Sequence, residues 1–150
     1  MHVRCWLTTG IVAMATLLLP FGLAQADMSE SDLKEAIVLR CHYQMGEFGV
    51  AAVQHCVEVE NAAMKSVSGY PQQAKEIVFR CTQRVQGDGW EVARACIDKD
   101  IEAEAALGNY PMEHTAVIES CRAQMGERGP AQVKACVDQR ISTQSPAERP

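Results

Sequence analysis

The sequence contains no basic cluster, few aromatic residues and, beyond residue 26, no long hydrophobic run. Its 150 residues include 14 Lys or Arg and 19 Asp or Glu, which gives a net charge of −5. An acidic chain without an Arg-rich segment binds phosphate backbones poorly, so we expect no nucleic-acid partner. A membrane span needs about 20 apolar residues, so we expect none in the chain after its leader.

Three other patterns are missing from the sequence. There is no Cys-x-x-Cys, which argues against a disulfide oxidoreductase, because those enzymes activate one thiol of that motif. There is no Asn-x-Ser/Thr, which favours a bacterial periplasm over a eukaryotic secretory route. No segment alternates apolar and polar residues with a period of two, so strands are not expected.

The N-terminus has the features of a secretory signal peptide. Residues 1–26, MHVRCWLTTGIVAMATLLLPFGLAQA, place early basic residues before an apolar run that ends in a small-x-small site. We predict cleavage after Ala26 and a periplasmic or secreted protein. Removing this segment takes away Arg4 and no acidic residue, so the net charge of residues 27–150 is close to −6.

The cysteine count supports export. The chain has seven cysteines, and Cys5 lies in the predicted signal peptide, which leaves an even set of six. An even set in an exported protein is typical of a disulfide framework. These six are Cys41, Cys56, Cys81, Cys96, Cys121 and Cys136.

The six cysteines recur with a period of 40 residues. Each pair brackets fourteen residues, in RCHYQMGEFGVAAVQHC, RCTQRVQGDGWEVARAC and SCRAQMGERGPAQVKAC. A period near 40 is typical of helical-hairpin repeats. We therefore predict one domain over residues 27–141, with repeats at about 32–71, 72–111 and 112–141. The last residues, 142–150, show no apolar periodicity and are predicted to be a flexible tail.

The apolar residues of each repeat follow a helical period. Before the first turn they fall at Ile37, Val38, Cys41 and Met45, which share one helix face, and the same offsets recur 40 and 80 residues later. The residues after each turn are also helically spaced. The predicted fold is all-α: three tandem disulfide-stapled hairpins forming a short α-solenoid or a compact helical array.

Glycines and polar residues punctuate the helices. We predict that Gly46 and Gly126 close the first helix of their repeats in a left-handed conformation. Gly49, three residues after Gly46, is expected at the start of the next helix. Asp32 and Glu35 resemble a capping box for the first helix.

Helix geometry selects one pairing of the cysteines. Cys41 lies about 6 Å before the end of its helix and Cys56 about 9 Å after the start of the next, at a rise of 1.5 Å per residue. Both lie on the inward stripe of antiparallel neighbours, within reach of a disulfide. The predicted pairs are Cys41–Cys56, Cys81–Cys96 and Cys121–Cys136.

The leading functional hypothesis is a non-catalytic binding or scaffold module. Repeat arrays present extended surfaces, and a stapled array does so with little loss of conformational entropy. Phe48 lies in a turn and Trp90 opens a helix, so these two aromatics are the candidate partner-binding residues. We expect the partner to be another envelope protein or a peptide.

Two other hypotheses remain open at this stage. His42, His55 and Met45 near the first cysteine pair could suit a metal, but the histidines are expected on opposite sides of their hairpin. A small ligand could also bind in a groove between repeats. Asp98 and Glu102 share a helix face and could serve a hydrolase, although such charges usually form a solvated face. We assign no metal site, cofactor or catalytic residue.

Overall fold

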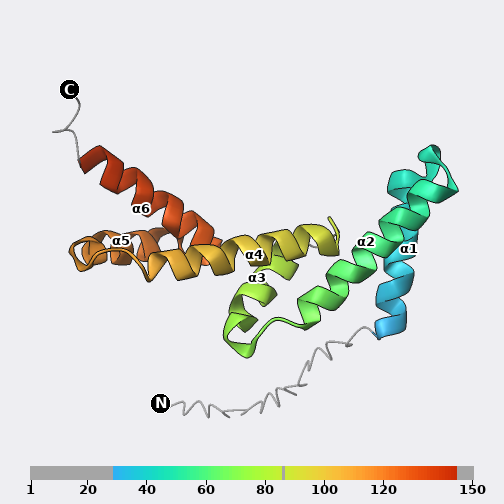
Figure 1. Ribbon diagram of the computed structural model, residues 1–150, viewed down its shortest axis with the longest axis horizontal. Helices are drawn as coiled ribbons and strands as arrows, with labels where there is room; N and C mark the ends of the chain where they lie inside the picture. Colours follow the sequence, from blue (N-terminus) through green and yellow to red (C-terminus); the bar gives the residue numbers. More distant parts are fainter. Residues whose placement is uncertain (1–28, 86, 145–150) are drawn as a thin grey trace, which may run out of the picture.

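The computed structural model describes residues 29–85 and 87–144, and within these ranges every regular element is a helix. The signal peptide predicted at residues 1–26 lies outside the described residues. Figure 1 shows three helical hairpins following one another along the long axis of the molecule. The all-α, three-hairpin prediction is therefore confirmed. The hairpins consist of α1 (Glu30–Met45) with α2 (Val50–Ser68), α3 (Lys75–Arg84) with α4 (Trp90–Leu107), and α5 (Thr115–Met125) with α6 (Pro130–Gln144).

One disulfide joins the two helices of each hairpin. The pairs are those that helix geometry predicts, with Cα–Cα distances of 5.7 Å, 5.8 Å and 5.9 Å along the chain. The first cysteine of each pair is completely buried, while the second is partly exposed. Three disulfides in a chain of this size indicate an oxidising compartment. None of the described helices is both long and apolar enough to cross a membrane.

The second helices of the three hairpins, α2, α4 and α6, pack against one another in series, each displaced along the molecule from the one before. Helix α4 packs against both α2 and α6, whereas α1, α3 and α5 pack mainly against the second helix of their own hairpin. Helices α4 and α6 each begin beside the middle of the previous second helix, and each is turned relative to that helix (Figure 1). Contacts between repeats are therefore concentrated where α4 packs against α2 and where α6 packs against α4.

The hydrophobic core is divided into three small clusters, one for each buried first cysteine. They consist of Ile37, Cys41 and Val53; Val67, Cys81 and Ile97; and Leu107, Cys121, Val133 and Val137. Trp90 packs against the first two clusters and so joins the first hairpin to the second. Because no cluster is large, the disulfides add stability that a single extended core would otherwise supply.

The turns differ from the prediction in one respect. Gly46 and Gly126 have right-handed helical backbones, with φ of −59° and −55°, and open short 3₁₀ turns. Left-handed backbones occur at the glycines directly before the second helices, Gly49, Gly89 and Gly129, with φ of 91°, 116° and 100°, and also at Gly87, with φ of 99°. In the first and third hairpins a 3₁₀ turn separates the two helices. The left-handed glycine follows that turn, so it lies three residues after the predicted position.

The start of the first helix and the end of the last helix also differ from the prediction. The capping box is formed by Ser29 and Asp32, each accepting a hydrogen bond from the other's backbone N–H, so the predicted pair Asp32 and Glu35 is wrong. Helix α6 continues to Gln144, three residues beyond Ile141, the predicted end of the domain. Polar side chains there bond to the preceding turn, which supports a helix that lacks apolar periodicity.

Candidate functional site

A buried carboxylate connects the first repeat to the second. Glu60, in the middle of α2, accepts a hydrogen bond from the backbone N–H of Trp90 at 2.6 Å. The same carboxylate oxygen lies 2.5 Å from Nη2 of Arg40 on α1. Glu60 therefore ties its own hairpin together and caps the first turn of the next long helix, α4.

The same arrangement recurs one repeat later. Asp100, in the middle of α4, accepts from the backbone N–H of Ala131 at 3.0 Å, and its other oxygen lies 3.4 Å from Nη2 of Arg80. That oxygen also contacts Sγ of Cys81, 3.9 Å away. With only 2% of its surface exposed, Asp100 is among the most buried polar residues described. We call these two arrangements the inter-repeat clasps.

Electrostatics explains why a carboxylate is stable in these positions. A buried carboxylate is costly unless it is paired and hydrogen-bonded. Each clasp supplies an arginine and the N-terminus of a helix, whose unbonded N–H groups and positive dipole end favour an anion. Glu60 and Asp100 are not among the site residues that the sequence predicts. The signal that could have found them is the twenty-residue spacing of Arg40 to Glu60, which recurs from Arg80 to Asp100.

The glycines before α4 and α6 are part of the clasps. A Cβ atom on Gly89 would lie 2.6 Å from Oε1 of Glu60, and one on Gly129 would meet the carboxylate of Asp100. Gly49 has the same left-handed backbone, but a Cβ added there would find open space. Glycine is therefore needed at position 49 only for its left-handed backbone. At positions 89 and 129 it is also needed because a side chain would collide with the carboxylate of Glu60 or Asp100.

This difference predicts unequal effects of two matched substitutions. Gly49→Ala and Gly89→Ala both introduce strain of about 1–3 kcal/mol at a backbone conformation that essentially only glycine adopts. Gly89→Ala also pushes away Glu60 and weakens its charged hydrogen bonds, so we expect it to lose about 2 kcal/mol more. Denaturant unfolding of the two variants measures the difference. Equal losses would mean that the close approach at Gly89 is unimportant.

The third repeat receives a carboxylate from Asp100 but does not itself supply the donor half of a clasp. Its equivalent positions hold Ser120 in place of arginine and Arg140 in place of the acid. Arg140 donates to Oγ of Ser120 and to Oε1 of Gln124, at 2.8 Å in each case. The cation that replaces the carboxylate is thus held within its own hairpin.

A second type of contact secures the linkers between repeats. Tyr70 and Tyr110, from the two Tyr-Pro links, each donate a hydrogen bond to an acid on the following second helix, Asp98 and Asp138 respectively. Partial burial and the hydrogen bond to Asp98 raise the pKa of Tyr70 to about 12. The bond to Asp138 likewise raises the pKa of Tyr110. These bonds use the acid that follows the second cysteine by two residues.

The raised tyrosine pKa predicts a loss of stability in alkali. An unfolded tyrosine has a pKa of about 10, so the Tyr70 contribution is complete below that pH and is lost as the pH rises towards about 12. We expect Tyr70→Phe to show a smaller decrease of Tm between about pH 10 and 12 than the wild type. Thermal unfolding followed by circular dichroism measures the decrease. Identical slopes for the two proteins would contradict this assignment.

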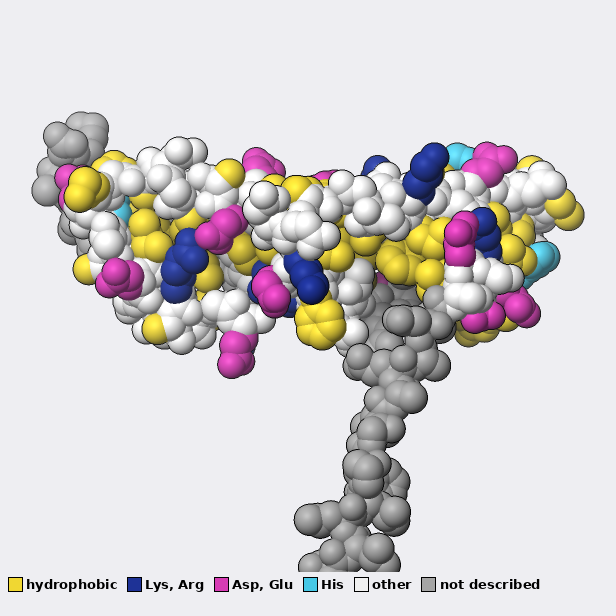
Figure 2. Space-filling model, turned by 90° about the horizontal axis from the view of Figure 1, so that it is seen from below, with side chains coloured by type: hydrophobic (Ala, Val, Ile, Leu, Met, Phe, Trp, Pro, Cys, Tyr) yellow, Lys and Arg dark blue, Asp and Glu magenta, His cyan; other side chains and the backbone are white. Residues whose placement is uncertain are grey.

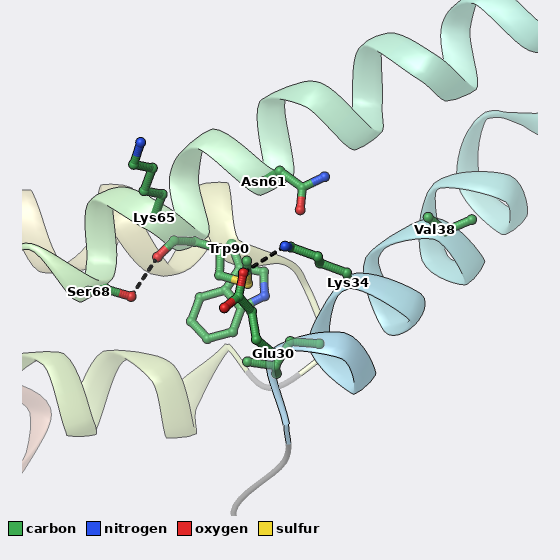
Figure 3. Close-up of a pocket in the computed structure, with 9 residues that line it drawn as sticks. Glu30, Lys34, Val38, Asn61, Lys65, Ser68 and Trp90 are labelled. Atoms are coloured by element: carbon green, nitrogen blue, oxygen red, sulfur yellow. Dashed lines mark hydrogen bonds and ion pairs between the residues drawn. The ribbon is translucent and has the colours of Figure 1, made fainter.

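The described surface is hollowed by a groove of about 760 Å³ between α1 and α2. Trp90 enters it from the second repeat, and Leu33, Val38 and Met64 supply further apolar walls. Figure 3 shows the indole ring between the two helices, with the Lys34–Glu30 ion pair of 2.6 Å beside it. We call this the Trp90 groove.

One polar atom in the Trp90 groove lacks a partner. Asn61 donates from Nδ2 to the backbone oxygen of Val57 at 2.8 Å. Its Oδ1 is buried and accepts no hydrogen bond from any described residue. A buried acceptor of this kind is costly unless it is satisfied, so a donor that displaced the atoms covering Oδ1 would gain a hydrogen bond.

The two candidate partner-binding residues lie far apart in the fold. Trp90 is partly buried between repeats and lines the groove, while Phe48 lies in the turn of the first hairpin with 68% of its surface exposed. Leu39, Tyr43 and Val50 of the same hairpin are also strongly exposed. Figure 2 shows hydrophobic side chains on the surface of the end that holds this hairpin.

The residues considered for other chemistry take structural or exposed positions. His42 and His55 are exposed, and Asp98 is engaged by the linker residue Tyr70. A cluster of Cys81, Cys96 and Asp100 has metal-ligand proximity, but the two sulfurs are joined in a disulfide and are not thiolates. Glu102 is exposed on α4. The Trp90 groove and the first hairpin are therefore the candidate sites.

Comparisons of the chain with protein-family models, curated proteins and solved structures found no match.

Proposed function

We propose that the protein is a non-catalytic binding module of the periplasm or the secreted fraction, and that it binds the apolar side of a peptide or helix of another envelope protein in the Trp90 groove. The observation that carries this proposal is an apolar groove of about 760 Å³ beside a partly exposed tryptophan. Grooves between helices commonly receive the apolar face of an amphipathic segment. Disulfides keep the walls in place before binding, which reduces the entropy lost on association.

The groove contains its own spectroscopic reporter. The chain has two tryptophans, Trp6 in the predicted signal peptide and Trp90 in the groove. In a protein that begins at Asp27, tryptophan emission therefore reports on Trp90 alone. A bound apolar side chain would remove water from the indole and shift its emission to shorter wavelength.

Two valine substitutions provide a matched test. Val38 lines the groove with 39% of its surface exposed, and Val92 has 45% exposed on α4 outside it. We would select displayed helical peptides against the wild type and titrate them while recording Trp90 emission. We expect Val38→Asp to weaken binding at least tenfold, equivalent to about 1.4 kcal/mol, and Val92→Asp to leave it nearly unchanged. Equal binding to all three proteins would place the site elsewhere.

A small ligand is the second candidate occupant, and the unpartnered Oδ1 of Asn61 favours it. Such a ligand would combine an apolar body with an amide or hydroxyl donor. Asn61→Leu separates the two possibilities: it should abolish binding of a small amide, while an apolar peptide face should still bind. Titration with copper or zinc tests the metal version, which predicts binding that depends on His42 or His55.

A further inference from the structure

The inter-repeat clasps define a rule for how one hairpin docks on another. The N-terminus of a second helix, preceded by a left-handed glycine, receives a carboxylate from the middle of the preceding second helix. The helices that supply the carboxylate share a pattern: an acidic residue, an alanine three residues after it and an aliphatic residue seven residues after it. These residues are Glu60, Ala63 and Val67 in α2, and Asp100, Ala103 and Leu107 in α4, and all six are buried.

The first hairpin presents the receiving half of this interface with no donor among the described residues. Gly49 adopts the same left-handed backbone as Gly89, and no described side chain caps the start of α2. Val50 is 74% exposed, whereas its equivalents Trp90 and Pro130 are largely covered by the preceding repeat. Val57 is partly exposed, while its equivalent Ile97 is fully buried.

The residues beside this open position are unusually apolar. Phe48 precedes Gly49, and the corresponding residues in the other repeats are Asp88 and Arg128. Terminal repeats of helical arrays ordinarily need a polar outer face for solubility. An exposed phenylalanine and valine on either side of the vacant position are instead suited to a protein partner.

A second copy of the chain does not fit this position. The donor residue at the other end of the array is Arg140, where the earlier repeats have Glu60 and Asp100. Its guanidinium would face the positive end of the α2 dipole and would bring no acceptor for the free N–H groups. Since no described residue of the chain supplies a carboxylate here, we take the occupant to be another protein.

We propose that the open end of the first hairpin, formed by Phe48, Gly49 and Val50, docks a helix of another protein with the pattern of the internal donors. That helix carries a carboxylate, a small residue three positions later and an aliphatic residue after seven. The carboxylate accepts from the first N–H groups of α2, as Glu60 does from Trp90. This surface is separate from the Trp90 groove, so the two proposals can fail independently.

The chain supplies a probe for the test. A synthetic peptide with the sequence of residues 97–110, stabilised as a helix, carries the Asp100 donor pattern. A peptide with Asp100→Asn, stabilised in the same way, is the matched control. Each is titrated into the isotope-labelled protein that begins at Asp27, with the backbone amides followed by NMR, which also detects weak binding.

We expect the donor peptide to shift the amide signals of Val50 and Ala51 and the Asn variant to bind at least tenfold more weakly. Gly49→Ala should remove these shifts while circular dichroism shows the helices intact. Equal binding of the acid and amide peptides, or no shift at Val50 and Ala51, would overturn the proposal. Concentration-dependent shifts of these amides in the protein alone would assign the surface to a second copy and also overturn it.

Discussion

Replacing Asp100 by alanine is expected to lower the free energy of unfolding by about 3–5 kcal/mol, because removing one partner of a buried ion pair leaves the other uncompensated. Asp100 is almost completely buried and holds both Arg80 and the first free N–H of α6. Its loss leaves a partly buried guanidinium and a helix N-terminus without an acceptor. Guanidinium unfolding followed by circular dichroism measures the change.

A neighbouring acid on the same helix provides the control for this prediction. Glu102 is exposed, so Glu102→Ala should change the stability by no more than about 0.5 kcal/mol. A double-mutant cycle between Arg80→Ala and Asp100→Ala should show strong coupling, since each removes the same interaction. If Asp100→Ala and Glu102→Ala had similar stabilities, the clasp would contribute little to holding the second and third hairpins together.

Loss of the central disulfide is expected to cost about 3 kcal/mol, since Cys81 and Cys96 are fifteen residues apart and close a loop of that size. Cys81→Ser and Cys96→Ser should each destabilise the protein by this amount, and the double variant should be little worse. The reason is that either substitution opens the same covalent loop. Thermal unfolding of the three variants, with free thiols blocked, tests this expectation.

The test depends on whether the stability losses of Cys81→Ser and Cys96→Ser add in the double variant. Losses from the two single variants that add in the double variant would contradict the Cys81–Cys96 pairing. Disulfide-linked peptide mapping of the exported wild type provides a direct check on all three pairs. The same measurement by mass spectrometry gives the N-terminal residue and so tests the predicted cleavage after Ala26.

The sequence was sufficient for the hairpins and for the cysteine pairs because both depend on local spacing. Apolar residues around Cys41 and Cys56 repeat with a helical period, and antiparallel helices joined by a short turn bring those cysteines to similar heights. The position of the left-handed glycine was harder to predict. Gly46 and Gly49 are both plausible from spacing alone, and the 3₁₀ turn between them decides the matter.

The role of Glu60 was not predicted because it depends on the placement of one hairpin against the next. In the sequence, Glu60 is one of several acids after Cys56, and a charge run on a helix normally indicates a solvated face. Glu60 reaches the backbone N–H of Trp90 only because α4 packs against the middle of α2. Trp90 and a groove between repeats were among the predictions, but the other residues of the Trp90 groove were not, since its walls come from two repeats.

The self-contained nature of the clasp has a consequence for how such a chain can change length during evolution. Helix α4 both receives a carboxylate at Gly89 and offers one at Asp100, so the forty-residue unit that contains it is complete in itself. A duplication of that unit would insert another hairpin between compatible neighbours without requiring any new kind of contact. The outer repeats lack this property, because the first has no donor among the described residues and the third offers Arg140. Growth by whole units in the interior is therefore the change that this architecture tolerates most readily.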